Sequence, residues 1–132
     1  SGSPMTQREL RYDSQRISDL QNIQWQLVNY WQQKERLPKA LVDLNDPISN
    51  FVVPIDPENK AYAYTPGEGT SFRLCATFSR ESLSSVSART IASEPYGVIG
   101  KGSETWNHPA GEYCFERSID PQLYPPRSKT VN

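Results

Sequence analysis

The stretch from Asp13 to Trp31, DSQRISDLQNIQWQLVNYW, is the only long periodic segment in the chain. At about 100° per residue its apolar side chains fall within one arc of a helix. This arc contains Ile17, Leu20, Ile23, Leu27 and Trp31, with Tyr30 at its edge. Away from its centre lie Gln15, Asp19, Gln26 and Lys34. The pattern predicts an amphipathic helix whose apolar face is covered by the rest of the chain.

Both limits of this helix are marked in the sequence. Asp13 or Ser14 can accept hydrogen bonds from the N–H groups of a first turn. Pro38 disfavours the α conformation in the residue before it, so the helix should end close to Arg36. The preceding residues, 1–12, are polar, and they are expected either to fray or to extend the same helix.

The composition favours one small domain with long irregular connections. With 132 residues, 36% of them apolar, and eleven prolines, the chain supports a single core. Its net charge is −1 and no stretch forms a basic stripe, so nucleic acid is not an expected partner.

The N-terminal sequence carries an expectation about location. No stretch approaches the roughly 18 apolar residues of a membrane span, and no signal peptide is visible. The opening Ser-Gly-Ser resembles the remnant of a cloning tag. A natural N-terminal region with a membrane segment is therefore expected to precede this chain.

Several short segments after the helix predict turns and strands. Leu41 and Leu44 indicate one short helical turn, and 56–60 is a turn in which Asn59 can adopt a positive φ. The predicted strands are 51–55, restricted by Pro54 to a sheet edge or a strand end, then 61–65, 71–78 and 112–117.

The two cysteines lie in two of these strands, on the face opposite the aromatic side chains. If the strands are antiparallel neighbours, one register places Cys75 opposite Cys114 at a spacing that a disulfide can span. Such a bridge closes a loop of about 40 residues, stabilises by roughly 4 kcal/mol and indicates an oxidising, extracytoplasmic compartment. Two unrelated buried thiols are the alternative.

The remaining segments have no stable hydrophobic period. Residues 79–108 are rich in serine and glycine and predict a long surface loop, and residues 121–132 predict an irregular, proline-marked tail. The division is a polar lead-in with the tag remnant at 1–12, one domain at 13–120 and the tail at 121–132. The fold class is α+β, with one long helix packed on a small antiparallel sheet.

Two segments resemble a known group of proteins. The run from Asp13 to Leu44 resembles the soluble half of the long helix in type IV pilins and type II secretion pseudopilins, with its LP stop and leucine pair. DPENKAYAY, at 56–64, is similar to a hairpin in the same group. The resemblance implies a pilin-like roll outside the cytoplasm.

A closer likeness is to uncharacterised bacterial envelope proteins in which a pilin-like domain follows membrane helices. It is carried by LCATF at 74–78 and by a second set of residues. These are Trp106, His108, Gly111, Cys114 and Phe115. The likeness implies the same fold and location.

His108 is the only candidate for acid–base chemistry, with Glu104 and Glu112 near it in sequence. No serine or cysteine nucleophile is marked by a motif, so a structural or exposed histidine is favoured over catalysis. Trp106 is expected to anchor the returning loop on the sheet.

Asp56, Glu58 and Asn59 are a weak calcium candidate, because they offer three oxygen ligands where the ion needs six or more. No other metal and no cofactor is expected. Trp25 lies opposite the apolar arc, where it would suit a protein contact or lie beneath the C-terminal tail.

The expected function is a non-catalytic, extracytoplasmic binding or assembly module with a protein partner in the bacterial envelope. Trp25, Trp106 and His108 are the candidate interaction residues. The alternatives are a small secreted hydrolase that uses His108, and a subunit of a pilus or pseudopilus filament.

Overall fold

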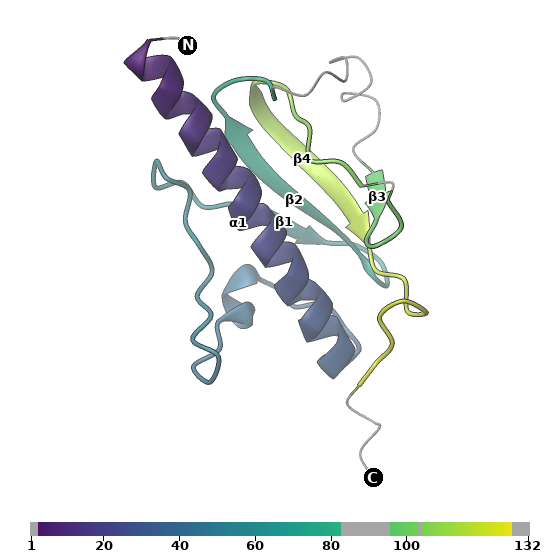
Figure 1. Ribbon diagram of the computed structural model, residues 1–132. Coiled ribbons are helices and arrows are strands. Elements are labelled where there is room, and N and C mark those ends of the chain that lie inside the picture. The colour runs from purple at the N-terminus through teal and green to yellow at the C-terminus, as the bar shows by residue number, and fades with distance from the viewer. Residues whose placement is uncertain (1–2, 83–95, 103, 128–132) are drawn as a thin grey trace.

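The computed structural model describes residues 3–82, 96–102 and 104–127. One long helix, α1 (Pro4–Lys34), lies diagonally across one face of a four-stranded sheet, as Figure 1 shows. The sheet contains β1 (Ala63–Pro66), β2 (Ser71–Phe78), β3 (Tyr96–Val98) and β4 (Gly111–Ser118) in the order β1-β2-β4-β3. A short 3-10 helix, η1 (Leu41–Leu44), connects α1 to the sheet. The α+β class is therefore confirmed.

The start of α1 differs from the predicted one. Ser3 caps the helix by accepting from the backbone N–H of Thr6, and Pro4 occupies the first turn. The polar lead-in is thus an extension of the same helix, and the predicted caps at Asp13 and Ser14 are wrong. At the other end Glu35 adopts a left-handed conformation and donates to the carbonyl of Trp31, close to the predicted stop.

The face of α1 toward the sheet is apolar in its middle, as predicted. Leu20, Ile23 and Leu27 are fully buried, and Trp31 is nearly so. Asp19 was expected away from this face but is buried. The hydroxyl of Tyr62 donates to its carboxylate over 2.6 Å and so compensates for the lost contact with water. The buried polar side chains of α1 also include Asp13, Arg16, Gln24 and Gln32. The covered face is therefore wider than the apolar stripe.

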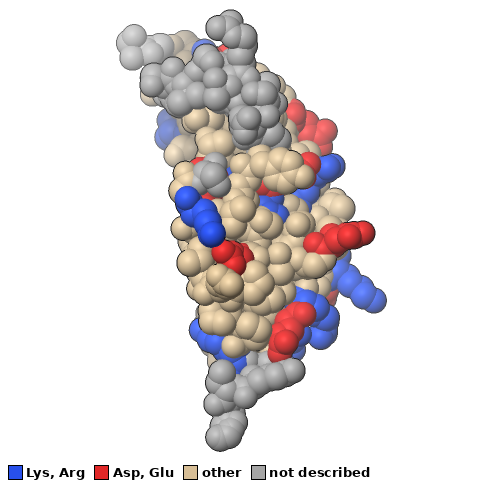
Figure 2. Space-filling view, turned by 90° about the vertical axis from the view of Figure 1, so that its right-hand side faces the viewer, with Lys and Arg blue, Asp and Glu red and all other residues tan. Residues whose placement is uncertain are grey.

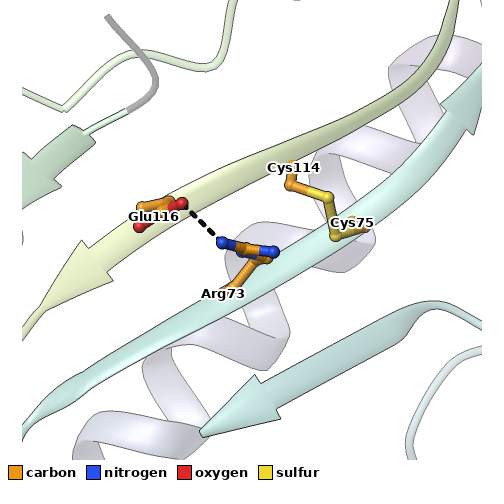
Figure 3. The surroundings of a disulfide bond; sticks show 4 residues. All are labelled: Arg73, Cys75, Cys114 and Glu116. Atoms are coloured by element: carbon orange, nitrogen blue, oxygen red, sulfur yellow. Dashed lines mark hydrogen bonds and ion pairs between the residues drawn. A yellow bond between two sulfur atoms is a disulfide. The ribbon is translucent and has the colours of Figure 1, made fainter. Parts of the chain in front are cut away.

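The two central strands pair in the register that the cysteines require. Cys75 lies opposite Cys114 in the antiparallel pair β2–β4, and the two form a disulfide with a Cα–Cα distance of 4.0 Å. The bridge lies on the sheet face that points away from α1, beside an ion pair between Arg73 and Glu116 (Figure 3). The opposite face carries Phe72, Leu74, Ala76, Phe78 and Phe115 into the core. The predicted alternation is confirmed.

Two strand predictions are wrong. No strand forms at 51–55, where only an isolated bridge joins Phe51 to Asp46. Conversely, β3 lies inside the predicted loop 79–108 and pairs in parallel with β4. Its three residues are too short for a period, and Gly97 is required there because a Cβ would lie 2.6 Å from the Cα of Glu104. Residues 83–95 of the predicted loop lie outside the described residues.

The chain returns along α1 after β4. The backbone N–H of Arg127 donates to the carbonyl of Gln32, and the Gln32 amide donates to the carbonyl of Pro125. The described part of the tail is therefore attached to the helix, as a tail lying across the surface would be. Among the described residues, no helix combines the length and apolar character that a membrane span needs.

Candidate functional site

A buried arginine joins three segments near the N-terminal half of α1. Arg16 donates from Nε and Nη2 to the two carboxylate oxygens of Asp56, over 2.5 and 3.2 Å. Its Nη1 contacts Asp13 at 2.8 Å, and its Nη2 contacts Glu58 at 2.6 Å. The two oxygens of Asp13 also accept from the backbone N–H groups of Ser79 and Arg80. This cluster ties α1 to the turn before β1 and to the end of β2.

Two of the three residues proposed as weak calcium ligands belong to this cluster. Asp56 and Glu58 both bind the Arg16 guanidinium, so a resident cation already neutralises them. Among the described residues, no three histidine, cysteine or acidic side chains are grouped to hold a metal. Asn59 adopts the predicted positive φ of 68° and completes the turn through its backbone N–H, which donates to the carbonyl of Asp56. The three residues form a structural turn.

The electrostatics of the cluster favour its charged forms. Burial alone would lower the pKa of Arg16, but its hydrogen bonds to Asp56, Asp13 and Glu58 raise that pKa above the usual value. Burial likewise opposes ionisation of Asp56. The Arg16 guanidinium and the backbone N–H of Glu58 outweigh it and lower the pKa of this carboxyl. Arg16 and Asp56 therefore both stay ionised near neutral pH.

His108 lies beside this cluster and is only 3% exposed. Its ring stacks on Phe78 with 3.6 Å between centroids, and its Nδ1 lies 3.1 Å from the carbonyl oxygen of Pro109. Burial lowers the pKa of His108, so the imidazole is neutral near pH 7. A neutral ring with Nδ1 donating to that carbonyl leaves Nε2 as an acceptor.

A small pocket of about 180 Å³ opens beside His108. Its walls include Leu10, Ile17, Asp13, Ser14, Glu81 and Ser82. A serine–histidine mechanism needs a carboxylate that orients the imidazole. Asp13, a buried carboxylate in this wall, is occupied by Arg16 and by two backbone N–H groups, and the Ser82 hydroxyl accepts from the backbone N–H of His108. Among the described residues that line the pocket, no serine–histidine–carboxylate triad is assembled.

Trp106 is half-buried and packs against the core, which agrees with its predicted role as an anchor. Its ring centroid lies 4.9 Å from that of Phe115, and the Arg117 guanidinium lies 4.5 Å above the Trp106 ring. Burial lowers the pKa of Arg117 to about 10. Arg117 also donates to Gln24 and to the carbonyl of Thr105. The sequence analysis did not predict a role for this arginine, although it lies two residues after Phe115 in β4 and therefore shares the inner face of the sheet.

Trp106 and His108 belong to one aromatic cluster, because Phe78 and Phe115 lie between them. Trp25 is separate from it. Its ring meets Tyr124 of the C-terminal segment edge-on at 5.8 Å, and it is still 44% exposed. The expected contact with the C-terminal tail is thus present on one side of the indole, and the expected contact with a protein partner stays a prediction.

The segment from η1 to the turn before β1 exposes an apolar strip that the sequence analysis did not predict. We define this strip as Val42, Ile48, Val52 and Ile55. Ile48 is 93% exposed, and each of the others is more than 60% exposed. Phe51 and Val53 alternate with them and pack on the core. The sequence pattern that could have predicted the strip is FVVPI at 51–55, which is apolar on both faces although only one face of a surface segment packs on the core.

Charge is mixed on the rest of the visible surface. On the face in Figure 2, blue and red side chains alternate beside a broad uncharged area, and no extended surface of one sign is seen. This agrees with the small net charge of the chain. Charge on this face therefore favours no highly charged polymer.

Comparison with known proteins adds no relative. The chain matches no protein-family profile, no curated protein and no solved structure at a significant level.

Proposed function

We propose that this chain is a non-catalytic binding or assembly module that works outside the cytoplasm, as part of a bacterial envelope protein held to the membrane by an N-terminal segment. The observation that carries the proposal is the apolar strip. Four large aliphatic side chains are exposed within 14 residues of the chain, and exposed apolar side chains that lie close together favour a protein contact. The partner is accordingly a protein with an apolar surface.

The disulfide supports the location. The chain has two cysteines, and both are consumed by the bridge. Structural disulfides persist in oxidising compartments and are rare in the cytoplasm. In Figure 1, α1 begins at one tip of the molecule, so an upstream membrane segment would join there without crossing the sheet.

The surroundings of His108 support a role without catalysis. Its Nδ1 faces a backbone carbonyl in place of a carboxylate, and Asp13 is bound to Arg16. Among the described residues that line the pocket beside it, no carboxylate is hydrogen-bonded to the imidazole to orient it for general acid–base hydrolysis. These contacts favour a structural role for His108.

A photo-crosslinking experiment tests the protein contact. The full-length protein, expressed in its own host, would carry p-benzoylphenylalanine at Val52 or at Ile48. The matched control carries it at Arg73, which is also exposed but lies on the outer face of the sheet. A discrete crosslinked partner from both strip positions and not from Arg73 is the expected result.

The identity of the crosslinked product separates the two kinds of module. A second copy of the same chain indicates assembly of the filament type, and a different envelope protein indicates a binding module. No product from either strip position, at a protein level equal to that of the control, would contradict the proposal.

A further inference from the structure

A second concave surface lies on the other half of α1 and differs in chemistry from the apolar strip. It is a groove of about 500 Å³ between the outer face of the helix and the residues after η1, with Ile48 at its rim. On the helix side it is lined by Gln26, Asn29, Tyr30, Gln33 and Lys34. Its volume falls within the usual range for ligand sites, about 300–1,000 Å³.

The wall opposite the helix is held in place by its own hydrogen bonds. Asn45 accepts from the backbone N–H of Val53 at 2.9 Å through its Oδ1, so its NH₂ group remains a donor. Asp46 accepts from the backbone N–H of Ile48 and from the Ser49 hydroxyl. A wall fixed in this way loses little conformational entropy when a ligand binds.

The groove presents neutral donors and acceptors to solvent. In the part of the chain that the structure describes, the side-chain amides of Gln26 and Gln33 have no hydrogen-bond partner, and each offers two donors and an acceptor. Asn45 adds its NH₂ group from the opposite wall. Tyr30 contributes part of an aromatic ring between the two glutamines.

The charges of the groove select against ionic ligands. Asp43 and Asp46 repel anions, and the single lysine, Lys34, lies over the Tyr30 ring at 6.0 Å. Both oxygens of Asp46 are already hydrogen-bonded within the loop, and Asp43 accepts from the backbone N–H of Ala40. A compact cation would therefore compete with bonds that hold the wall. A neutral ligand rich in hydroxyl groups meets neither obstacle.

From these features we propose that the groove binds a neutral oligosaccharide. Amide side chains form paired hydrogen bonds with neighbouring sugar hydroxyls, and the half-buried ring of Tyr30 adds apolar surface to the wall between them. Gln26, Tyr30 and Gln33 follow one another along two helical turns of about 5.4 Å each. One turn is comparable with the length of one sugar unit in an extended chain, so this helical wall spans about two units.

The groove shares Ile48 with the apolar strip, but its ligand differs, and Val52, the other crosslinking position of the strip, does not line it. The proposed protein contact is tested by crosslinking at Val52, whereas sugar binding in the groove is tested by titrating the 132-residue chain with a sugar. Loss of one result leaves the other unchanged. An extended peptide is the competing occupant, but it would need a strand edge or pockets for apolar side chains, and the groove has a helix and a polar loop as its walls.

The test is a titration followed by ¹⁵N–¹H correlation spectra, in which the side-chain amides of Gln26, Gln33 and Asn45 are direct reporters. The probes are chitotriose, cellotriose and maltotriose, with trigalacturonic acid as an anionic probe and the peptide Gly-Ser-Gly-Ser as a peptide probe. We expect at least one neutral trisaccharide to shift these reporters saturably in the millimolar range. The anionic probe and the peptide should leave them unmoved.

Matched alanine variants locate the effect. Gln33→Ala should weaken binding of the active trisaccharide by about three- to tenfold, the effect of one or two lost hydrogen bonds. Gln7→Ala removes the same side chain from an exposed position in the first turn of α1 and should leave the affinity unchanged. Both replacements favour the helix, so neither variant should fail to fold.

Three results would overturn the proposal. The first is the absence of saturable shifts with all three neutral sugars at 20 mM. The second is equal affinity for Gly-Ser-Gly-Ser, which would assign the groove to peptides. The third is a Gln33→Ala variant that binds as tightly as the Gln7→Ala control.

Discussion

Arg16 and Asp56, 40 residues apart in the chain, form a two-pronged ion pair in which Nε and Nη2 each contact one carboxylate oxygen. Both side chains are almost completely buried. The pair fixes the turn before β1 against α1, and so it holds the end of the segment that carries the apolar strip. Its energetic role follows from burial, because a charge left alone in this position has no water to solvate it.

Replacement of Arg16 by methionine should therefore destabilise the domain strongly. The variant leaves Asp56 and Asp13 buried without their cation, and removal of one partner of a buried pair costs about 3–5 kcal/mol. Urea unfolding followed by circular dichroism measures this change. The matched control is Arg73→Met, which removes an arginine from the exposed pair with Glu116 and should cost at most about 1 kcal/mol. Equal costs for the two variants would show that the Arg16 cluster is not a buried network.

The apolar half of this architecture was predictable from periodicity. The helix phase, the strand at 71–78 and the pairing of Cys75 with Cys114 follow from patterns of period 3.6 and 2, because these patterns report which face meets the core. The polar half was not. Arg16 is buried together with carboxylates such as Asp56 that lie far along the chain. A charged side chain on a helix is expected to be exposed unless such partners are known. The same holds for Asp19 and its donor Tyr62.

Strand β3 and the groove escaped the sequence for a related reason. Three residues around Gly97 carry no measurable alternation, and their pairing depends on the position of β4. The groove is formed by Gln33 and Asn45 from two segments that each look like ordinary polar surface. Only the path of the chain after η1 brings them to face each other.

His108 should make stability depend on pH in a predictable direction. Burial lowers its pKa in the folded state, so the unfolded chain binds the proton first as the pH falls. Stability is fully present above the unfolded pKa of about 6.5 and declines below it, by at most about 1.4 kcal/mol per pH unit, until the folded-state pKa is reached. Of the nearby charged groups, Asp13 raises the pKa of His108 and Arg16 lowers it.

The chain contains one histidine, which makes this prediction testable with one variant. Unfolding free energies from urea titrations between pH 7.5 and 5.5 should decline for the native protein and stay nearly level for His108→Phe. A native profile that is flat over this range would contradict the assignment. Losses at lower pH come instead from carboxyl groups whose pKa is lowered, among them the buried Asp56, because their contributions disappear as the pH falls through their folded-state values.

The apolar centre of α1 should dominate the stability of the helix–sheet packing. Leu27 is fully buried, so Leu27→Ala should cost about 2–5 kcal/mol, and Leu20→Ala should behave alike. Gln21 is only half-buried and belongs to no core contact, so Gln21→Ala should cost little. Calorimetry on the three variants checks the phase of the helix. Comparable losses for Gln21→Ala and Leu27→Ala would show that the phase is wrong.

The disulfide should hold the two central strands together without being needed for the helix. Cys75 and Cys114 lie opposite each other in β2 and β4, on the face away from α1, and enclose the segment that contains β3. Thiol titration of the unreduced protein in denaturant should find no free sulfhydryl.

Reduction, or the Cys75→Ala/Cys114→Ala double variant, removes the constraint on the unfolded chain and should lower stability by roughly 4 kcal/mol on the chain-entropy model. The far-ultraviolet helix signal should remain below the new midpoint, because the core contacts of Leu20 and Leu27 do not involve the bridge. Two titratable thiols in the unreduced protein would contradict the bridge and remove the support that it gives to an extracytoplasmic location.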